Sequence, residues 1–324
     1  MNERQHYWDN VKGILILLVV AAHFMLRKDE IFKAVYHGIY LFHMPLFIFI
    51  SGLFHRHEKV RERVLSLIII GILYNAALIV VDHVLLGKVQ DFYLFKATKI
   101  PWFVLTIAMC TLLTYLFRDC SKHMILTVSV FLGCVACYDS SLMNYMAIAK
   151  MVSWYPFYFL GSMLDFKKIE KVLKSERMFS WAGGGILATY ILVTILGRNG
   201  CVSISKMAFL YGANRVYPTP SAIWIIVKLL YYAVVIVVSL SLLLVIPSQR
   251  VPGLTTLGRR TMQIYFWHIM VRSLVFAAGV PEYICISPAG YLLWTILSIV
   301  ITGILSLDIF GFPTNWIIRS VKKR

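Results

Sequence analysis

Three side chains near the N-terminus have the types and spacing for proton transfer beside a bound anion. Asp9, Lys12 and His23 lie before or within an apolar stretch. In an α-helix, eleven residues at about 100° each bring His23 nearly back above Lys12, roughly 16 Å along the axis. Asp9 joins the same face if the helix begins that early. One helix face then carries an acid, a base and an imidazole.

Such a stripe suits acyl transfer to an alcohol. An alcohol is a poor nucleophile until a base removes its proton, and neutral histidine, with a pKa of about 6.5, matches that task. A cation at the membrane surface, here Lys12, suits the phosphates of a nucleotide-like donor. The spacing alone leaves a structural interpretation open, in which His23 hydrogen-bonds between helices and Lys12 extends to the interface.

Two more histidines, His43 and His268, fall inside apolar runs. An ionisable group within a membrane span is costly, so each marks a candidate site. Pro45 follows His43 closely and favours a helix kink that makes room for a polar side chain. His268 follows Tyr265, Phe266 and Trp267, which either stack on a sugar ring or pack against neighbours. For both histidines, packing remains the alternative.

A basic segment follows the second apolar run. Its residues Lys59, Arg61 and Arg63 come directly before the third run. Arginine side chains at this spacing are able to clamp phosphate through bidentate hydrogen bonds. The same residues also fit the positive charge that ordinarily flanks a membrane span on its cytoplasmic side.

Composition predicts the elements that position these residues. Of 324 residues, 60% are hydrophobic and 15% charged, against about 25% charged in soluble domains. The net charge of +17 sits in short clusters between apolar runs, so we expect no nucleic-acid partner. About 20 apolar residues cross a bilayer as a helix. Runs near that length are 11–26, 36–54, 64–86, 100–117, 124–138, 146–164, 179–196, 222–246, 262–280 and 289–310.

The distribution of basic residues orients these ten runs. Both termini and the even-numbered loops together hold 20 Lys and Arg, and the remaining loops hold 9. Positive charge marks the cytoplasmic side, so the fold class we predict is an all-α integral membrane protein of about ten transmembrane helices, with both termini cytoplasmic. No repeat or long linker divides residues 1–324, which we therefore treat as one domain. The first helix is expected to be retained rather than cleaved as a signal peptide.

The cysteines indicate no metal or disulfide framework. Six are spread along the chain, and only Cys134 and Cys137 form a CxxC pair. That pair lies in an apolar run without a second Cys or His pair to complete a zinc site. We expect these cysteines to act as small buried hydrophobes and expect no metal ion.

Several segments, in order along the chain, resemble the membrane-bound acyltransferase-3 family, and within it the fucose 4-O-acetylase-like branch. The resemblance covers residues 7 to about 270. It is carried by 7–13 followed by His23, by 42–47 with Ser51-Gly52, by 101–105, by 157–161, and by 257–262 through Tyr265 and His268.

The resemblance implies ten helices, a cytoplasmic acyl-CoA donor, usually acetyl-CoA, and O-acylation of a saccharide or polysaccharide at or across the membrane. We therefore expect O-acetylation of a cell-surface carbohydrate at a bacterial cytoplasmic membrane. The family's basic residue, ten intervening residues and histidine correspond to Lys12 and His23. Many members have arginine at the first position, so a lysine there gives no bidentate clamp.

These observations predict a role for each candidate residue. His23 is expected to be the general base or to carry the acyl group, with Asp9 and Lys12 positioning the reacting groups. We expect phosphate binding by Lys59, Arg61 and Arg63 and a cavity lined by His43, Trp102 and His268. The expected partners are the saccharide acceptor and membrane lipid.

Two other functions use the same residues. A ten-helix transporter or flippase for a glycan or small metabolite would use the intramembrane polar groups as a binding site, although no internal repeat or paired broken helices favour it. A structural partner of a polysaccharide assembly complex would need these groups only for stability.

Overall fold

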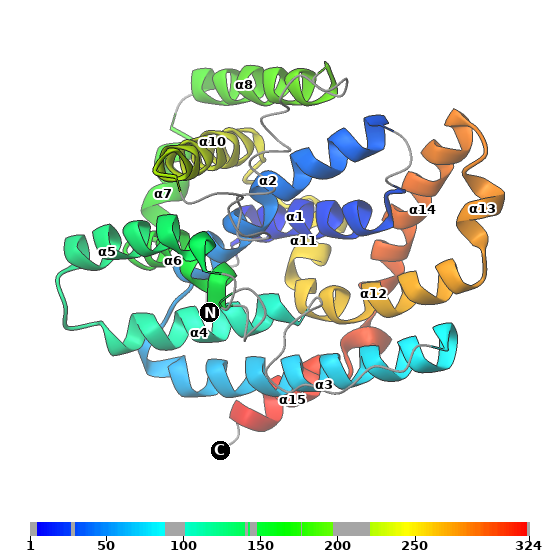
Figure 1. The fold of residues 1–324 in the computed structure, drawn as a ribbon, viewed down its shortest axis with the longest axis horizontal. Coiled ribbons are helices and arrows are strands. Elements are labelled where there is room, and N and C mark those ends of the chain that lie inside the picture. Colours follow the sequence, from blue (N-terminus) through cyan, green and yellow to red (C-terminus); the bar gives the residue numbers. More distant parts are fainter. Residues whose placement is uncertain are drawn as a thin grey trace. The chain divides into compact units, whose positions relative to one another are not determined.

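The computed structural model describes residues 5–26, 30–87, 101–139, 142, 148–175, 177–196 and 221–322, and all regular secondary structure in these residues is helical (Figure 1). A helix forms at each of the ten apolar runs. These helices are α1 (His6–Phe24), α2 (Glu30–Leu53), α3 (Val60–Leu86), α4 (Trp102–Leu116), α5 (Lys122–Val135), α6 (Ile148–Ser162), α8 (Arg177–Leu196), α10 (Ile223–Val245), α12 (Thr261–Ala277) and α14 (Pro288–Leu305).

Six of these helices, α1, α2, α3, α8, α10 and α14, are long and apolar enough to cross a membrane. The other four, α4, α5, α6 and α12, have between 14 and 17 residues. At 1.5 Å per residue they extend roughly 21 to 26 Å, less than the hydrocarbon thickness of about 30 Å. The all-helical prediction is therefore confirmed for the described residues, whereas ten complete crossings and cytoplasmic termini stay predictions.

Short helices also lie between or after the long ones. They are α7 (Phe166–Leu173), α11 (Pro252–Arg259), α13 (Val280–Ile284) and α15 (Thr314–Lys322), with 3₁₀ turns η1 (His57–Lys59), η2 (Ala136–Tyr138) and η5 (Asp308–Gly311). The helix α7 begins at an N-cap, Asp165, whose carboxylate accepts the backbone N–H of Lys167 at 2.8 Å and of Lys168 at 3.0 Å. These bonds, with that of Lys168 first, hold the pKa of Asp165 below its ordinary value.

The chain forms two compact units. The first comprises Met1–Tyr36, Leu73–Phe92 and Ile246–Arg324, and the second comprises His37–Ile72 and Tyr93–Val245. The boundaries fall within α2 and α3, so each of these helices contributes to both units. The assignment of residues 1–324 to a single domain stays a prediction.

In the first unit, α1 is the central packing element and contacts α11, α12 and α14. Two glycines allow α11 to approach α1 closely. A Cβ on Gly258 would overlap the backbone oxygen of Asp9, and a Cβ on Gly13 would overlap that of Leu254. Backbone contact at both positions fixes α11 against the polar end of α1.

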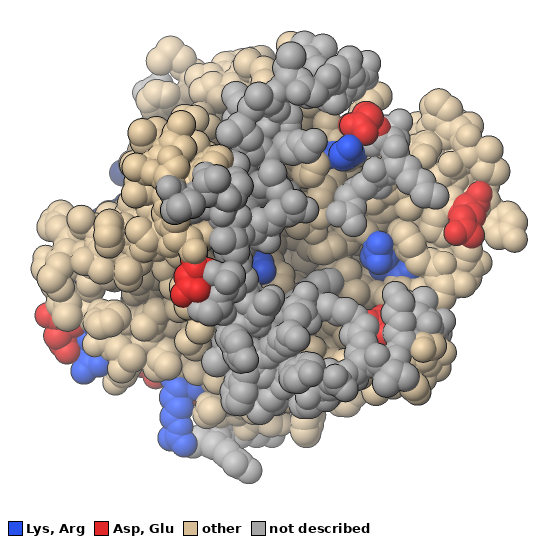
Figure 2. Space-filling view, viewed as in Figure 1, with Lys and Arg blue, Asp and Glu red and all other residues tan. Residues whose placement is uncertain are grey.

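In the second unit, α6 packs against α4 and α5, and α10 packs against α5 and α8 (Figure 1). The outer surface of α10 keeps large apolar side chains exposed, among them Ile226, Leu230 and Leu240. In Figure 2 the described Lys, Arg, Asp and Glu side chains form separate small patches among other residues. An exposed apolar surface like that of α10 is unfavourable in water and fits the hydrocarbon of a bilayer.

Candidate active site

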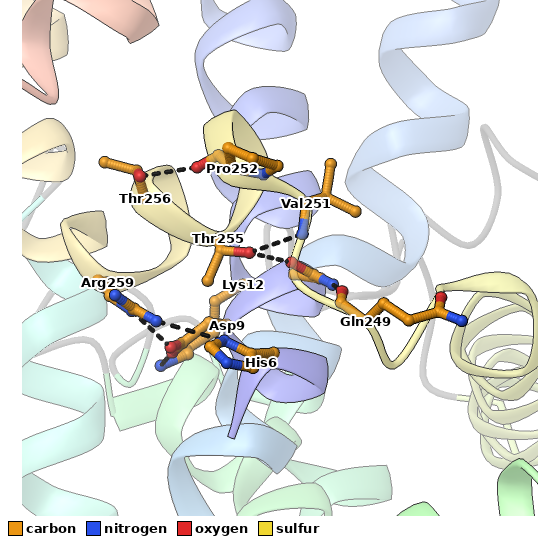
Figure 3. Close-up of polar contacts among 10 residues, drawn as sticks. His6, Asp9, Lys12, Gln249, Val251, Pro252, Thr255, Thr256 and Arg259 are labelled. Atoms are coloured by element: carbon orange, nitrogen blue, oxygen red, sulfur yellow. Dashed lines mark hydrogen bonds and ion pairs between the residues drawn. The ribbon is translucent and has the colours of Figure 1, made fainter. Parts of the chain in front are cut away.

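The first part of the site is an ion-pair cluster at the start of α1 (Figure 3). One carboxylate oxygen of Asp9 lies 2.8 Å from Lys12 Nζ, and the other accepts the Nε–H of Arg259 at 3.0 Å. The helix begins at His6, early enough for the predicted pairing of Asp9 with Lys12 on one face. Arg259, at the end of α11, completes the cluster from the far end of the sequence.

The charges of this cluster do not cancel. Asp9 offers one negative charge to two cations, Lys12 and Arg259, and a guanidinium nitrogen of Arg259 also lies 3.3 Å from His6 Nδ1. The side chains of Lys12 and Arg259 remain 26% and 30% exposed, so a ligand can reach them. A half-buried cationic site of this kind favours a phosphate or another anion.

Asn10 holds α11 in the position that brings Arg259 to Asp9. Its buried amide donates to the backbone oxygens of Pro247 and Gln249 at 2.9 and 2.8 Å. Its side-chain oxygen accepts the hydroxyl of Thr255 at 2.7 Å. These three bonds satisfy a buried amide and tie both α11 and the chain before it to α1.

The other end of α1 is closed by side chains from α12 and α14. The last carbonyl groups of a helix lack partners within the helix. Arg272 Nε donates to the backbone oxygen of His23 at 2.6 Å, and Trp294 Nε1 donates to that of Phe24 at 2.7 Å. The guanidinium carbon of Arg272 also lies 4.0 Å from the ring centroid of Phe276. A cation at a helix C-terminus is favourable, so these contacts hold His23 in place.

His23 and His268 meet at this closed end of α1. Their ring centroids are 5.2 Å apart, and the ring planes form an angle of 47°. The His268 side chain is fully buried, and its Nδ1 lies 2.7 Å from the backbone oxygen of Tyr265. A carbonyl only accepts, so Nδ1 carries the proton and Nε2 of neutral His268 is the basic nitrogen.

Two buried polar atoms, one in this pair and one on a neighbour of Tyr265, have no hydrogen-bond partner among the described residues. They are His268 Nε2 and the hydroxyl of Tyr74 on α3. The ring of Tyr265 packs against both side chains, with centroids 5.4 Å from Tyr74 and 5.9 Å from His268. Unsatisfied buried groups are rare in folded proteins, and an acceptor and a hydroxyl on side chains that both contact Tyr265 suit a polar substrate.

His43 and Trp102 belong to the second unit. His43, 1% exposed on α2, has Nδ1 2.6 Å from the backbone oxygen of Ile39 and its ring edge against Tyr40. Trp102, at the start of α4, packs against Trp154 with ring centroids 5.2 Å apart. Their place in one cavity with His23 stays a prediction.

The basic residues of the second unit include Lys59, at the end of η1, and Arg61 and Arg63, at the start of α3. The side chains of Lys59 and Arg61 are exposed. Arg63 donates to the backbone oxygens of Phe54 at 3.2 Å and Ser51 at 3.0 Å, and so closes the C-terminal end of α2. A guanidinium has five N–H donors, so this contact does not use its whole capacity. Phosphate binding by the three residues stays a prediction.

A chain of hydrogen bonds within the second unit ends at His57, close in sequence to these basic residues. Thr111 donates to the backbone oxygen of Ile107, so its hydroxyl oxygen accepts from Tyr158 at 2.8 Å. The oxygen of Tyr158 then accepts the Nδ1–H of His55 at 3.0 Å. The Nε2 of His55 is left to accept from His57 Nδ1 at 3.4 Å. Burial first, and then the charges of His57 and Arg63, lower the pKa of His55 to about 4.

In the part of the chain that the structure describes, no group of three or more His, Cys, Asp or Glu could hold a metal ion. Cys134 and Cys137 are both buried thiols.

Long apolar helices and an imidazole pair at the end of one of them define a multi-pass membrane protein with a candidate site for proton transfer. Residues 5–309 match the acyltransferase-3 family, described as an acyltransferase domain, and the chain belongs to that family. The acyltransferase class expected from the sequence is thereby confirmed. A comparison with curated proteins and one with solved structures each find no match.

Four residues that sequence reasoning did not select contribute to this site: Asn10, Tyr74, Arg259 and Arg272. A weak signal existed for Arg272, a cation within an apolar run, and for Arg259, one of two adjacent arginines just before such a run. Asn10 lies within the segment 7–13 of the family resemblance, and Tyr74 carries no signal, because the roles of both depend on contacts with distant segments.

Proposed function

We propose that the protein is a membrane O-acetyltransferase that moves an acetyl group from acetyl-CoA to a hydroxyl of a cell-surface saccharide or polysaccharide. Membership of the acyltransferase-3 family supports acyl transfer. The observation that carries the site assignment is the buried imidazole of His268 beside His23 with an unpartnered Nε2. The protein's place would be the cytoplasmic membrane of a bacterium.

In this proposal His23 acts as general base. Its imidazole takes the proton of the acceptor hydroxyl while the hydroxyl oxygen bonds to the thioester carbonyl carbon. The C–S bond then breaks, the acetyl ester forms, and the proton held by His23 passes to the departing thiolate. His268 Nε2 and the Tyr74 hydroxyl suit hydrogen bonds to the acceptor sugar, because both are buried and unpartnered among the described residues. An acetyl-His23 intermediate is the competing route.

Lys12 and Arg259 are proposed to bind phosphates of the donor, with Asp9 holding the two cations in place. Their shared carboxylate and partial exposure support this role. The proposal keeps Lys59, Arg61 and Arg63 as further phosphate-binding residues and His43 and Trp102 as cavity residues. Those assignments rest on the sequence, so each is to be tested by its own substitution.

The test is acetyl transfer from radiolabelled acetyl-CoA by purified wild-type and His23→Ala protein, with and without candidate surface glycans. We expect His23→Ala to lower the rate of glycan-dependent transfer by about 10²- to 10⁴-fold, as is typical on loss of a general base. Equal rates in the two proteins, at matched protein levels, would contradict the role of His23. A transporter would leave the thioester intact.

A further inference from the structure

An apolar cavity of about 400 Å³ lies in the second unit, between α2, α6, α7 and α10. Its lining is aliphatic and aromatic apart from Lys168 on α7 and Ser239 on α10. The volume falls in the range of small-molecule sites. We call it the α7 cavity. Its composition excludes a sugar or nucleotide, which would need many more polar partners, and favours a hydrocarbon chain with one anionic end.

The helix α7 is fixed across the end of α10. Lys174, which follows α7, donates from Nζ to the backbone oxygens of Leu243 and Leu244 at 3.0 and 2.7 Å. Ser180 donates to the same oxygen of Leu244 at 3.0 Å. Two of the C-terminal carbonyls of α10, those of Leu243 and Leu244, are thereby satisfied. This places α7 at the level where a membrane-crossing helix ends, which is the level of lipid head groups.

Three apolar residues of α7, Ile169, Val172 and Leu173, line the cavity. Leu173 is buried and Val172 is also 65% exposed, whereas Lys167 and Lys171 are exposed and do not line the cavity. This pattern is typical of a helix that lies in the membrane interface.

The charge near the cavity is positive. Lys167, Lys168, Lys171 and Lys174 outnumber the acids of the segment, Asp165 and Glu170. Asp165 is occupied as the N-cap of α7, and Lys174 by the end of α10. Lys168 is the charged residue that both lines the cavity and is exposed, so an anionic head group is best placed there.

We propose that the α7 cavity binds one acyl chain of an anionic glycerophospholipid, with the lipid phosphate at Lys168. The apolar lining accepts the chain, and the lysines of α7 select the head group. This lipid site is separate from acetyl transfer, so it stands or falls independently of the proposed function.

The test is native mass spectrometry of the full-length protein, purified in detergent and titrated with phosphatidylglycerol or with phosphatidylcholine of the same chains. We expect one retained phosphatidylglycerol and weaker retention of phosphatidylcholine. Lys168→Gln should weaken phosphatidylglycerol binding about fivefold, since one lysine near a lipid surface contributes about that factor. The matched control is Lys122→Gln, which removes an exposed lysine that does not line the cavity and should bind like wild type.

A second variant fills the cavity. Ser239→Phe adds a ring at a buried lining position and should abolish retention of both lipids. Equal lipid retention by wild type, Lys168→Gln and Ser239→Phe would overturn the proposal. The proposal would also be overturned if the protein retained added undecaprenyl phosphate but no phosphatidylglycerol. A third contrary result would be a lipid-free dimer of the protein that Ser239→Phe dissociates. Lys168→Gln changes an exposed side chain and should fold like wild type. If Ser239→Phe misfolds, the comparison of Lys168→Gln with wild type still decides the proposal.

Discussion

The ring of His268 lies 5.2 Å from that of His23, centroid to centroid, although one belongs to α12 and the other to α1. The proton on His268 is fixed at Nδ1 by the backbone oxygen of Tyr265, so its Nε2 is available only as an acceptor. An acceptor sugar bound here would meet two basic nitrogens. One is able to take the reacting proton, and the other is able to hold a neighbouring hydroxyl.

The first prediction distinguishes the roles of the two ring nitrogens of His268. A glutamine at this position places an acceptor near the site of Nε2, whereas an asparagine keeps only a donor near Nδ1. If Nε2 binds the acceptor, His268→Gln should retain more activity than His268→Asn, and the asparagine variant should lose about tenfold or more in kcat/KM for the glycan.

Steady-state kinetics with the glycan as varied substrate measure this difference. Binding of acetyl-CoA by both variants is the control, and it should match wild type. Equal losses in the two variants would show that the histidine acts through packing alone.

Arg259 provides the second prediction. Arg259→Gln removes one of the two cations on Asp9, so acetyl-CoA should bind about three- to tenfold more weakly, and the dependence of binding on salt should become shallower. Isothermal titration with CoA at two salt concentrations measures both effects. Arg319→Gln, an exposed arginine on α15, is the matched control. Unchanged CoA affinity at low salt would exclude a phosphate at Arg259.

The third prediction concerns the contact of α11 with α1. A Cβ on Gly258 would overlap the backbone oxygen of Asp9, so Gly258→Ala must push α11 away and disturb the bond between Arg259 and Asp9. We expect a loss of about 1 to 3 kcal/mol in the free energy of unfolding. A Cβ on Gly253, in the same helix, would meet nothing within 4 Å. Gly253→Ala should be as stable as wild type or more so in thermal unfolding, and equal stability of the two variants would count against this packing.

The helices were the most predictable part of this protein. Hydrophobic runs near 20 residues are set by bilayer thickness, and a helix forms at each of the ten. The shared face of Asp9 and Lys12 follows from helix geometry in the same way, and their ion pair bears it out. Both features depend on local sequence and need no knowledge of the tertiary fold.

The contacts between distant segments could not be predicted in this way. Arg259 reaches Asp9 only because glycine at 258 allows α11 to touch α1. The helix-closing contacts of Arg63, Lys174 and Arg272 are a second example, since the sequence shows a cation but not which carbonyl it will bind. The sequence therefore shows the positive charge of these residues, but not that they also donate hydrogen bonds to carbonyl groups at the ends of helices.

The last prediction is a pH dependence of stability that depends on His55. The pKa of His55 is about 4 in the folded protein, against 6.5 ordinarily, because burial and nearby positive groups disfavour its charged form. Between these values the unfolded chain binds a proton that the folded chain does not. Stability is therefore complete above pH 6.5 and falls as the pH is lowered toward 4. Protonation would also remove the Nε2 acceptor for His57.

Thermal unfolding of wild type and His55→Gln across this range measures the effect. The variant should lose less stability on acidification than wild type, and parallel curves for the two proteins would exclude His55 as the source.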